Sequence, residues 1–206
     1  MQTNATSRAL AVAVWPEDVN RAVQAVVLVL AGTAILAISA KIKVPFYPVP
    51  MTLQTLAVLL ISATYGSRLA VATVAAYILE GMLGLPVFTN TPPAIAGPLY
   101  MLGPTGGFIV SWLAVAVIVG SAADRGWDRS IVKLGAAMLV AIVVQFALGF
   151  AWLAWFAQLS SGGMGVGAAG AFTGGVLPFL LGDALKVILA ALAVPAAWNL
   201  VDRRSV

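Results

Sequence analysis

Six apolar stretches dominate the chain, and each is close to the length that crosses the hydrocarbon core of a membrane as a helix. A helix rises about 1.5 Å per residue, so about 20 apolar residues span a core about 30 Å thick. The predicted spans are Ala22–Ala40, Met51–Gly66, Leu69–Val87, Pro104–Ala123, Leu134–Gln158 and Val176–Leu200. This pattern predicts an all-α, polytopic membrane protein with six transmembrane helices.

The composition excludes a soluble globular domain. Hydrophobic residues occupy 62% of the 206 positions and charged residues only 9%, whereas a soluble domain carries about 25% charged residues. A soluble core of this length has no means of burying so much apolar surface. We therefore expect a multi-pass protein of the cell (inner) membrane. Its single membrane domain covers residues 22–200, between tails at residues 1–21 and 201–206.

The distribution of Lys and Arg predicts which side of the membrane each loop occupies. If the N-terminus is inside, Lys41 and Lys43 are the two basic residues on the outer side. The inner side then holds eight, namely Arg8, Arg21, Arg68, Arg125, Arg129, Lys133, Arg203 and Arg204. Cytoplasmic loops carry the excess of basic residues, so both tails are predicted to be cytoplasmic. This topology accounts for the net charge of +4 without a nucleic-acid partner.

Two residue types are missing, and their absence removes several kinds of chemistry. Without cysteine and histidine, the chain has no disulfide, no thiolate or imidazole ligand and none of the commonest nucleophile–base pairs. It also lacks the Gly-Lys-Ser/Thr loop of nucleotide-hydrolysing proteins. We expect no enzymatic activity, no metal site and no cofactor. An intramembrane Ser–Lys dyad at Lys186 is the enzymatic alternative, and it requires a serine that the sequence does not place.

Two charged residues in the last predicted span carry the strongest functional signal. Asp183 and Lys186 are three apart and therefore share one face of a helix. Lys186 lies roughly 15 Å below the outer end of its span, too deep to reach the surface easily. Ionisable residues at such depth usually mark a function. We predict that the two residues form the floor of an outward-opening cavity. Lys186 would face an anionic group of a ligand, and Asp183 would orient Lys186 or accept a hydrogen bond from an N–H group of the ligand. The alternative is an ion pair that only neutralises itself.

Side chains near the outer ends of the other spans are candidates for the mouth of this cavity. A largely apolar pocket with a few fixed hydrogen-bonding groups suits a small amphipathic molecule. The candidates are Tyr47, Thr52, Gln54, Phe88, Asn90 and Tyr100. Each aromatic residue can instead anchor the membrane interface. Glu80, in the third span, is either a structural partner of Lys186, a residue facing internal water, or a ligand acceptor or proton carrier.

Four motifs, in this order and spacing, resemble those of the BioY family. They are Pro48-Val-Pro-Met-Thr-Leu-Gln-Thr55, Gly84-Leu-Pro-Val-Phe88, Gly103-Pro-Thr-Gly-Gly-Phe108 and Gly182-Asp-Ala-Leu-Lys186. BioY proteins are the substrate-binding components of energy-coupling-factor biotin transporters. The resemblance extends over residues 22–200. It implies a six-helix fold that binds biotin from outside at high affinity and reorients to release it. It also implies two kinds of partner, a transmembrane coupling subunit and a pair of cytoplasmic ATP-binding subunits.

The resemblance also assigns roles to particular residues. Asp183 and Lys186 match the family's aspartate and lysine, which contact the head or carboxylate region of biotin. Small residues of the first helix contact the coupling subunit in this family, which implies docking at Thr33, Ala34 and Ala37. Here the alanines recur every third residue rather than every fourth. The alternative function is a proton-coupled secondary transporter of a small amphipathic anion, working through Glu80 and Asp183.

Overall fold

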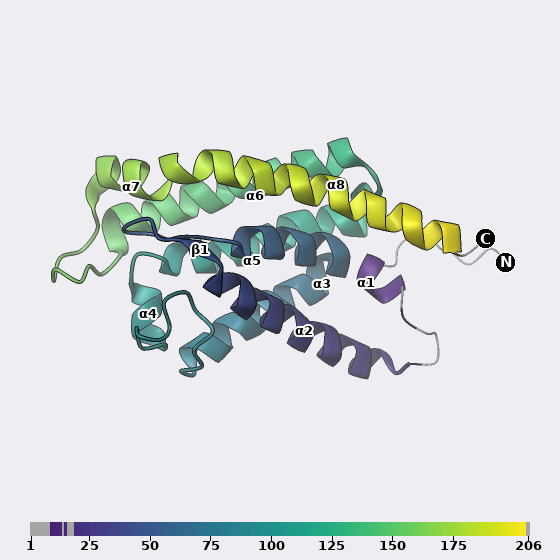
Figure 1. Ribbon diagram of the computed structural model, residues 1–206, viewed down its shortest axis with the longest axis horizontal. Helices are drawn as coiled ribbons and strands as arrows, with labels where there is room; N and C mark the ends of the chain where they lie inside the picture. The colour runs from purple at the N-terminus through teal and green to yellow at the C-terminus, as the bar shows by residue number, and fades with distance from the viewer. Residues whose placement is uncertain (1–8, 14, 16–18, 205–206) are drawn as a thin grey trace.

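The protein is an elongated bundle of helices, shown in Figure 1 by a computed structural model that describes residues 9–13, 15 and 19–204. The α-helices are α1 Leu10–Ala13, α2 Arg21–Lys41, α3 Gln54–Met82, α4 Pro98–Leu102, α5 Gly106–Asp124, α6 Ile131–Ala151, α7 Gly167–Gly175 and α8 Leu180–Arg204. Shorter helical turns are η1 Trp127–Arg129, η2 Trp152–Phe156 and η3 Leu177–Phe179. Two short strands, β1 Lys43–Val44 and β2 Met51–Thr52, pair antiparallel.

The predicted all-α membrane fold is confirmed, while the count of six spans remains a prediction. Within the described residues, five helical stretches are long and apolar enough to cross a membrane, and α3 is counted among them as one helix. Yet α3 is interrupted at Gly66, where φ is 74° and ψ is 173°. Gln54 and Tyr77 would lie about 35 Å apart on a straight helix, but their side chains share a hydrogen bond of 2.7 Å. The two halves of α3 are therefore antiparallel, and the reversal falls where the second predicted span ends.

The reversal at Gly66 is held by the end of α5, the helix at the centre of the bundle. Asp124 accepts hydrogen bonds from the backbone N–H of Ser67 at 3.2 Å and from its hydroxyl at 2.5 Å. A carboxylate at the start of a helix satisfies free N–H groups and interacts favourably with the helix dipole. Close packing continues one turn earlier, because a Cβ atom on Gly120 would lie 2.5 Å from the Cα of Ser67.

Replacing Gly66 by alanine is expected to lower the stability of the bundle more than an otherwise similar change at Gly126. Both glycines have positive φ, of 74° and 77°. Gly126, with ψ of 17°, is in the left-handed helical region, where a side chain costs about 1–2 kcal/mol, whereas Gly66, with ψ of 173°, is in a region that is essentially restricted to glycine. At Gly66 the new Cβ would also lie 2.3 Å from Oδ1 of Asp124, whereas nothing lies within 4 Å of it at Gly126. Thermal unfolding of both variants in detergent measures the difference, and equal melting temperatures would contradict the tighter constraint at Gly66.

Residues 159–175 join the fifth and sixth predicted spans, and their run of glycines predicts a flexible connection, but the segment contains a helix. Residues Gly167–Gly175 form α7, which packs against η2 and the β1–β2 loop. A Cβ atom on Gly174 would lie 2.6 Å from Cδ of Pro48, and one on Gly175 would lie 2.6 Å from Cδ2 of Leu153. The glycines thus permit close packing here instead of flexibility. The chain then turns through η3 into α8, which begins four residues later than the predicted span and continues to Arg204.

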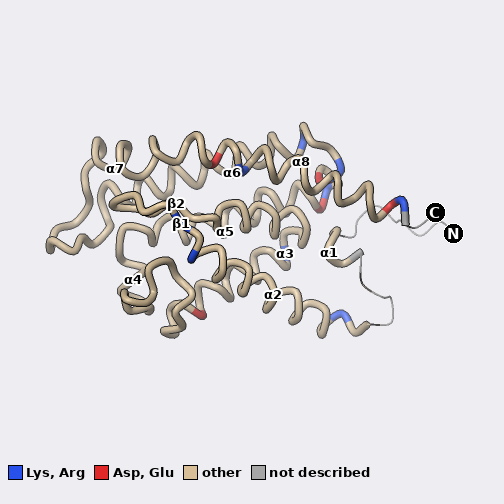
Figure 2. Tube along the Cα trace, viewed as in Figure 1, with Lys and Arg blue, Asp and Glu red and all other residues tan. Residues whose placement is uncertain are grey.

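Charged residues gather at the end of the bundle where α2 begins and α8 ends, opposite the end that holds α4 and α7 (Figure 2). We call it the basic end, after Arg21, Arg68, Arg125, Arg129, Lys133 and Arg203. Here η1 is joined to α8. Asp128 accepts a hydrogen bond of 2.5 Å from the indole N–H of Trp198, and Arg129 forms an ion pair of 2.8 Å with Asp202. These contacts fix α8, which carries the charged pair of interest.

Candidate functional site

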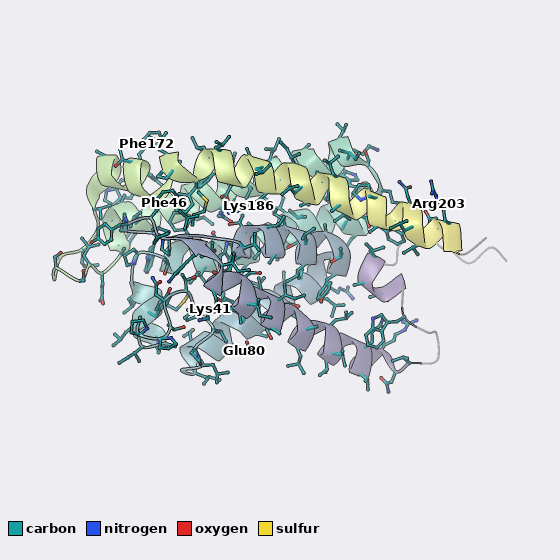
Figure 3. All side chains as sticks on the ribbon, in the orientation of Figure 1. Lys41, Phe46, Glu80, Phe172, Lys186 and Arg203 are labelled. Carbon is teal, nitrogen blue, oxygen red and sulfur yellow. The ribbon has the colours of Figure 1, made fainter. Side chains whose placement is uncertain are left out.

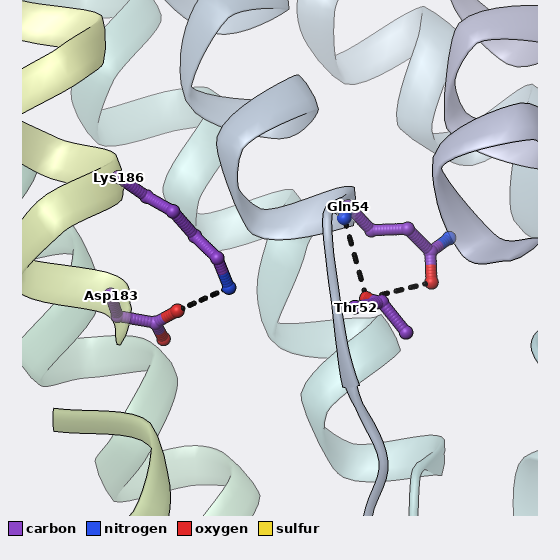
Figure 4. Close-up of polar contacts among 4 residues, drawn as sticks. All are labelled: Thr52, Gln54, Asp183 and Lys186. Carbon is purple, nitrogen blue, oxygen red and sulfur yellow. Dashed lines mark hydrogen bonds and ion pairs between the residues drawn. The ribbon is translucent and has the colours of Figure 1, made fainter. Parts of the chain in front are cut away.

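The two charged residues of α8 form an ion pair inside the bundle, as their spacing predicts. Nζ of Lys186 donates to Oδ1 of Asp183 at 2.7 Å. Asp183 is 1% exposed and Lys186 is 8% exposed, whereas Leu181 and Leu185 on the other face of α8 are exposed to the surroundings. The pair points from α8 toward Thr52 and Gln54, at the end of β2 and the start of α3 (Figure 4).

A cavity lies between this pair and the opposite helices, and we call it the central cavity. Its walls come from β2 and the β1–β2 loop, α3, the α3–α4 loop, α4, the α4–α5 connection, α5, α6, η3 and α8. It has a volume of about 40 Å³, enough for roughly three water molecules. Its lining residues are Val49, Pro50, Thr52, Gln54, Thr55, Thr89, Tyr100, Thr105, Phe108, Ile109, Trp112, Gln145, Phe146, Phe179, Asp183 and Lys186.

Unpaired polar atoms converge on the central cavity. Among the described residues, the buried side-chain polar atoms without a hydrogen-bond partner are Nε1 of Trp112, Oε1 of Gln145 and Oδ2 of Asp183. All three residues line this one cavity. Buried polar groups are almost always paired, and an unpaired one costs about 1–3 kcal/mol. One donor and two acceptors are therefore held beside a buried ammonium group, an arrangement suited to a polar ligand.

Gln54 organises the wall opposite the ion pair, and its own amide group is fully used. Its Nε2 donates to Oη of Tyr77 at 2.7 Å and to the carbonyl of Leu36 at 3.3 Å. Its Oε1 accepts from the hydroxyls of Thr52 at 3.3 Å and Thr89 at 3.2 Å. With two donors and two acceptors engaged, Gln54 fixes the positions of its neighbours around the cavity.

The α3–α4 loop, residues 83–97, is tied to the end of α2 by a lysine. Nζ of Lys41 donates to the backbone carbonyls of Pro86 at 2.8 Å, Phe88 at 2.8 Å and Thr91 at 2.6 Å. An ammonium group has three N–H donors, so each carbonyl has one to accept. Lys43 adds a hydrogen bond to the side chain of Asn90. The two lysines predicted on the outer side thus hold the loop that supplies Thr89 to the cavity.

Tyr100 of α4 closes the same part of the wall. Its hydroxyl donates to the carbonyl of Thr89 at 2.5 Å. Burial raises the pKa of the Tyr100 phenol, so this group stays neutral and remains a hydrogen-bond donor.

The structure brings five of the eight predicted ligand-binding residues to the central cavity: Thr52, Gln54, Tyr100, Asp183 and Lys186. The other three lie elsewhere. Phe88 is fully buried behind the wall, with its ring stacked on Tyr100 at a centroid distance of 4.8 Å. Asn90 bonds to Lys43, and Tyr47 is 83% exposed on the β1–β2 loop.

Two residues with unpaired atoms, Gln145 and Trp112, were absent from the predicted set. Gln145 is a lone amide in the middle of an apolar span, which is a signal that sequence reasoning can use. A tryptophan in the middle of a span, such as Trp112, is equally compatible with a core position. The apolar wall residues, for example Phe108 and Phe179, look like any other membrane-embedded side chain.

Glu80 lies apart from the site. It is partly buried near the end of α3 and forms no ion pair or side-chain hydrogen bond with the part of the chain that the structure describes. Figure 3 places it across the bundle from Lys186, whose partner is Asp183. Glu80 does not line the central cavity. The structure therefore offers no support for Glu80 as a partner of Lys186 or as a ligand acceptor.

The sequence model of the BioY family matches residues 6–203. The chain belongs to the BioY family. It is 34% identical to a probable biotin transporter BioY of Pyrococcus horikoshii over 165 residues, which is 80% of this chain and 90% of the relative. It is 31% identical to the biotin transporter BioY of Thermotoga maritima over 167 residues, which is 80% of this chain and 91% of the relative. Membership confirms the resemblance carried by the four motifs and a multi-pass location in the cell membrane.

A crystal structure of the S-component for biotin from an ECF-type ABC transporter has the same fold. The TM-score is 0.70 at 22% sequence identity, over 89% of this chain and 95% of that one. This likeness confirms that the present chain has the fold of an S-component.

Proposed function

We propose that this BioY protein binds biotin from the outer side of the membrane and delivers it inward together with ATP-driven partner subunits. The observation that carries the proposal is the convergence of three unpaired polar atoms and the Lys186 ammonium group on the central cavity. Under the same proposal the chain has no catalytic activity of its own, since its site binds a molecule that leaves unchanged.

The unpaired atoms are complementary to the ureido ring of biotin. That ring has two N–H donors and one carbonyl acceptor, while the cavity presents two acceptors, on Asp183 and Gln145, and one N–H donor, on Trp112. Lys186 supplies a cation for the ureido carbonyl or the valerate carboxylate. The aromatic and aliphatic walls, which include Phe108, Phe146 and Phe179, suit the thiophane ring and the chain.

The central cavity must widen to admit a molecule of this size. Its volume of about 40 Å³ is small beside the roughly 300–1,000 Å³ of typical ligand pockets. The longest walls without helical structure are the β1–β2 loop and the α3–α4 loop. We infer that these two loops separate when biotin enters and close over it afterwards.

The substrate is tested by titrating the purified full-length protein with biotin, desthiobiotin and lipoate. Desthiobiotin retains the ureido ring, whereas lipoate has a sulfur ring and an acid chain without it. We expect lipoate to bind at least about 100-fold more weakly, because the ureido-facing atoms then stay unpaired. The affinity for desthiobiotin should be much closer to that for biotin than the affinity for lipoate is. Lipoate that binds as tightly as biotin would show that the cavity recognises only the acid chain.

The exposed face of α2 is where we propose that the transmembrane coupling subunit docks. Thr33 is 4% exposed and its hydroxyl donates to the carbonyl of Leu30, so it belongs to the interior. Ala37 packs partly against the core. Ala34 lies on the exposed face, in a row formed by Val27, Ala31, Ala34 and Ile38. Small residues let helices approach closely within lipid, so the centre of this row suits a partner helix.

The basic end is proposed to face the cytoplasm. It holds most of the Lys and Arg residues that the structure describes, whereas Lys41 and Lys43 lie away from it (Figure 2), and cytoplasmic segments carry the excess of Lys and Arg. If each half of α3 counts as one pass, this orientation gives six passes with both tails inside. It also turns the loops beside the central cavity toward the outside, where biotin is captured. The ATP-binding subunits then act from the side of the basic end.

A further inference from the structure

A second concave feature lies on the outside of the bundle, between α5 and α6 near the basic end. We call it the α5–α6 groove, and its volume is about 360 Å³. Its lining residues are Val117, Ile118, Ser121, Ala122, Arg125, Trp127, Ala137 and Val140. Val117 and Val140 are 50% and 56% exposed, so the groove opens on the surface that faces lipid. It shares no residue with the central cavity.

Arg125 gives the mouth of the groove an uncompensated positive charge. It donates one hydrogen bond, of 2.9 Å, to the carbonyl of Ser121, although a guanidinium group has five N–H donors. It forms no ion pair with any residue that the structure describes. The described carboxylates at this end bond elsewhere: Asp124 to Ser67, Asp128 to Trp198 and Asp202 to Arg129.

Two further residues extend the polar mouth. Lys133 is exposed and precedes Ala137 by four residues, so it lies above the groove on the same face of α6. Trp127 is partly exposed and lines the groove beside Arg125. Tryptophan prefers the level of the lipid headgroups, where its ring packs on chains while its N–H meets polar groups. The groove therefore changes from apolar to cationic along its length.

We propose that the α5–α6 groove is a binding site for an anionic phospholipid of the surrounding membrane. An acyl chain lies along Val117, Ile118 and Val140, and the phosphate is bound by Arg125. Lys133 adds a second cation at the headgroup. Basic pockets between transmembrane helices at the cytoplasmic side bind acidic headgroups by this combination of charge and shape, and guanidinium groups pair with phosphate through two parallel hydrogen bonds.

Another groove on the same surface shows why the charge matters. It has a volume of about 480 Å³ between α3, α5 and α6, near α4, and none of its lining residues is ionisable. Such a groove accepts acyl chains whatever their headgroup. Val110, which is 51% exposed, lines it as Val140 lines the α5–α6 groove. The two positions therefore make a matched pair for a bulky substitution.

The test is native mass spectrometry of the full-length protein, released from micelles with equal amounts of phosphatidylglycerol and phosphatidylcholine. The wild type should retain phosphatidylglycerol with roughly 30-fold preference, which corresponds to about 1 kcal/mol for each of two basic residues. Arg125→Ala/Lys133→Ala should lose this preference. The control Arg68→Ala/Arg203→Ala removes two exposed charges from the same end and should keep it. If both double variants lose the preference equally, diffuse charge explains it and the proposed site is refuted.

A second pair of variants tests the acyl chain. Val140→Trp fills the α5–α6 groove without changing charge and should reduce retained phosphatidylglycerol about tenfold, whereas Val110→Trp should leave it unchanged. Equal retention by the two variants overturns the placement of the chain. Thermal unfolding of every variant shows that the protein is folded, so the lipid result can be read independently of biotin binding.

Discussion

Asp183→Asn is expected to weaken biotin binding by about 10- to 150-fold, because a hydrogen bond to a buried charge contributes about 1.5–3 kcal/mol. The substitution keeps the size of the side chain but replaces an acceptor oxygen of a residue that lines the cavity, where Oδ2 of Asp183 has no hydrogen-bond partner among the described residues. Lys186→Met should have an effect of similar size, since it leaves the buried carboxylate of Asp183 without its partner at 2.7 Å. Equilibrium titration with biotin measures both changes.

The matched control for this prediction is Asp202→Asn on the same helix. Asp202 also pairs with a basic residue, at 2.8 Å, but its side chain is 53% exposed at the basic end. Exposed ion pairs contribute only about 0–1 kcal/mol, so binding should not change. The double variant Asp183→Asn/Lys186→Met should lose less than the product of the single effects, because the two residues act as one unit. Wild-type affinity in both single variants would refute the assignment of the site.

The second large effect is expected from Ala34→Trp, which should abolish most ATP-driven biotin uptake while leaving biotin binding intact. Ala34 is on the exposed face of α2 and does not line the central cavity. A bulky residue forced into a close helix contact costs about 1–3 kcal/mol, which weakens the complex with the coupling subunit roughly 5- to 150-fold. Uptake into cells and co-purification of the partner subunits are the two measurements.

Ile35→Trp serves as the control for the docking prediction. It enlarges an exposed residue at the same level of α2, about 100° around the helix from Ala34. Uptake should continue in this variant. If Ala34→Trp loses biotin binding as well as uptake, the face of α2 is needed for the fold of the S-component rather than for docking. If both variants transport normally, the partner docks elsewhere.

Much of the fold and part of the site follow from local sequence patterns. Apolar runs of about 20 residues predict membrane helices whatever lies around them. The three-residue spacing of Asp183 and Lys186 predicts a shared helix face, and the cost of charge in lipid predicts that this face is turned inward. Thr52 and Gln54 follow from their position near the outer end of the second predicted span, at the mouth of the cavity predicted above this pair.

Other features depend on contacts between residues far apart in the sequence. The aromatic and amide residues of the α3–α4 loop, Phe88 and Asn90, are equally suited to a cavity wall, a core or a surface. Hydrogen bonds from Lys41 to the carbonyl of Phe88 and from Lys43 to the side chain of Asn90 fix which of these positions each residue takes. Both lysines are more than 40 residues away in the sequence. The glycines of residues 159–175 predict flexibility, whereas in the fold Gly174 packs tightly on Pro48 and residues Gly167–Gly175 form a helix. Gln145 is a single amide among apolar neighbours. Its role as an unpaired acceptor beside the cavity depends on how α6 packs against the other helices.

The three hydrogen bonds from Lys41 to main-chain carbonyls have an evolutionary consequence. Every residue supplies a carbonyl, so substitutions at Val87, Thr89 or Asn90 leave the partners of this ammonium group unchanged. The backbone of the loop is thereby fixed independently of the side chains that it displays. Substitution there can alter the wall of the cavity in single steps, each within a preserved frame. A scaffold of this kind can acquire a new substrate without first losing its shape.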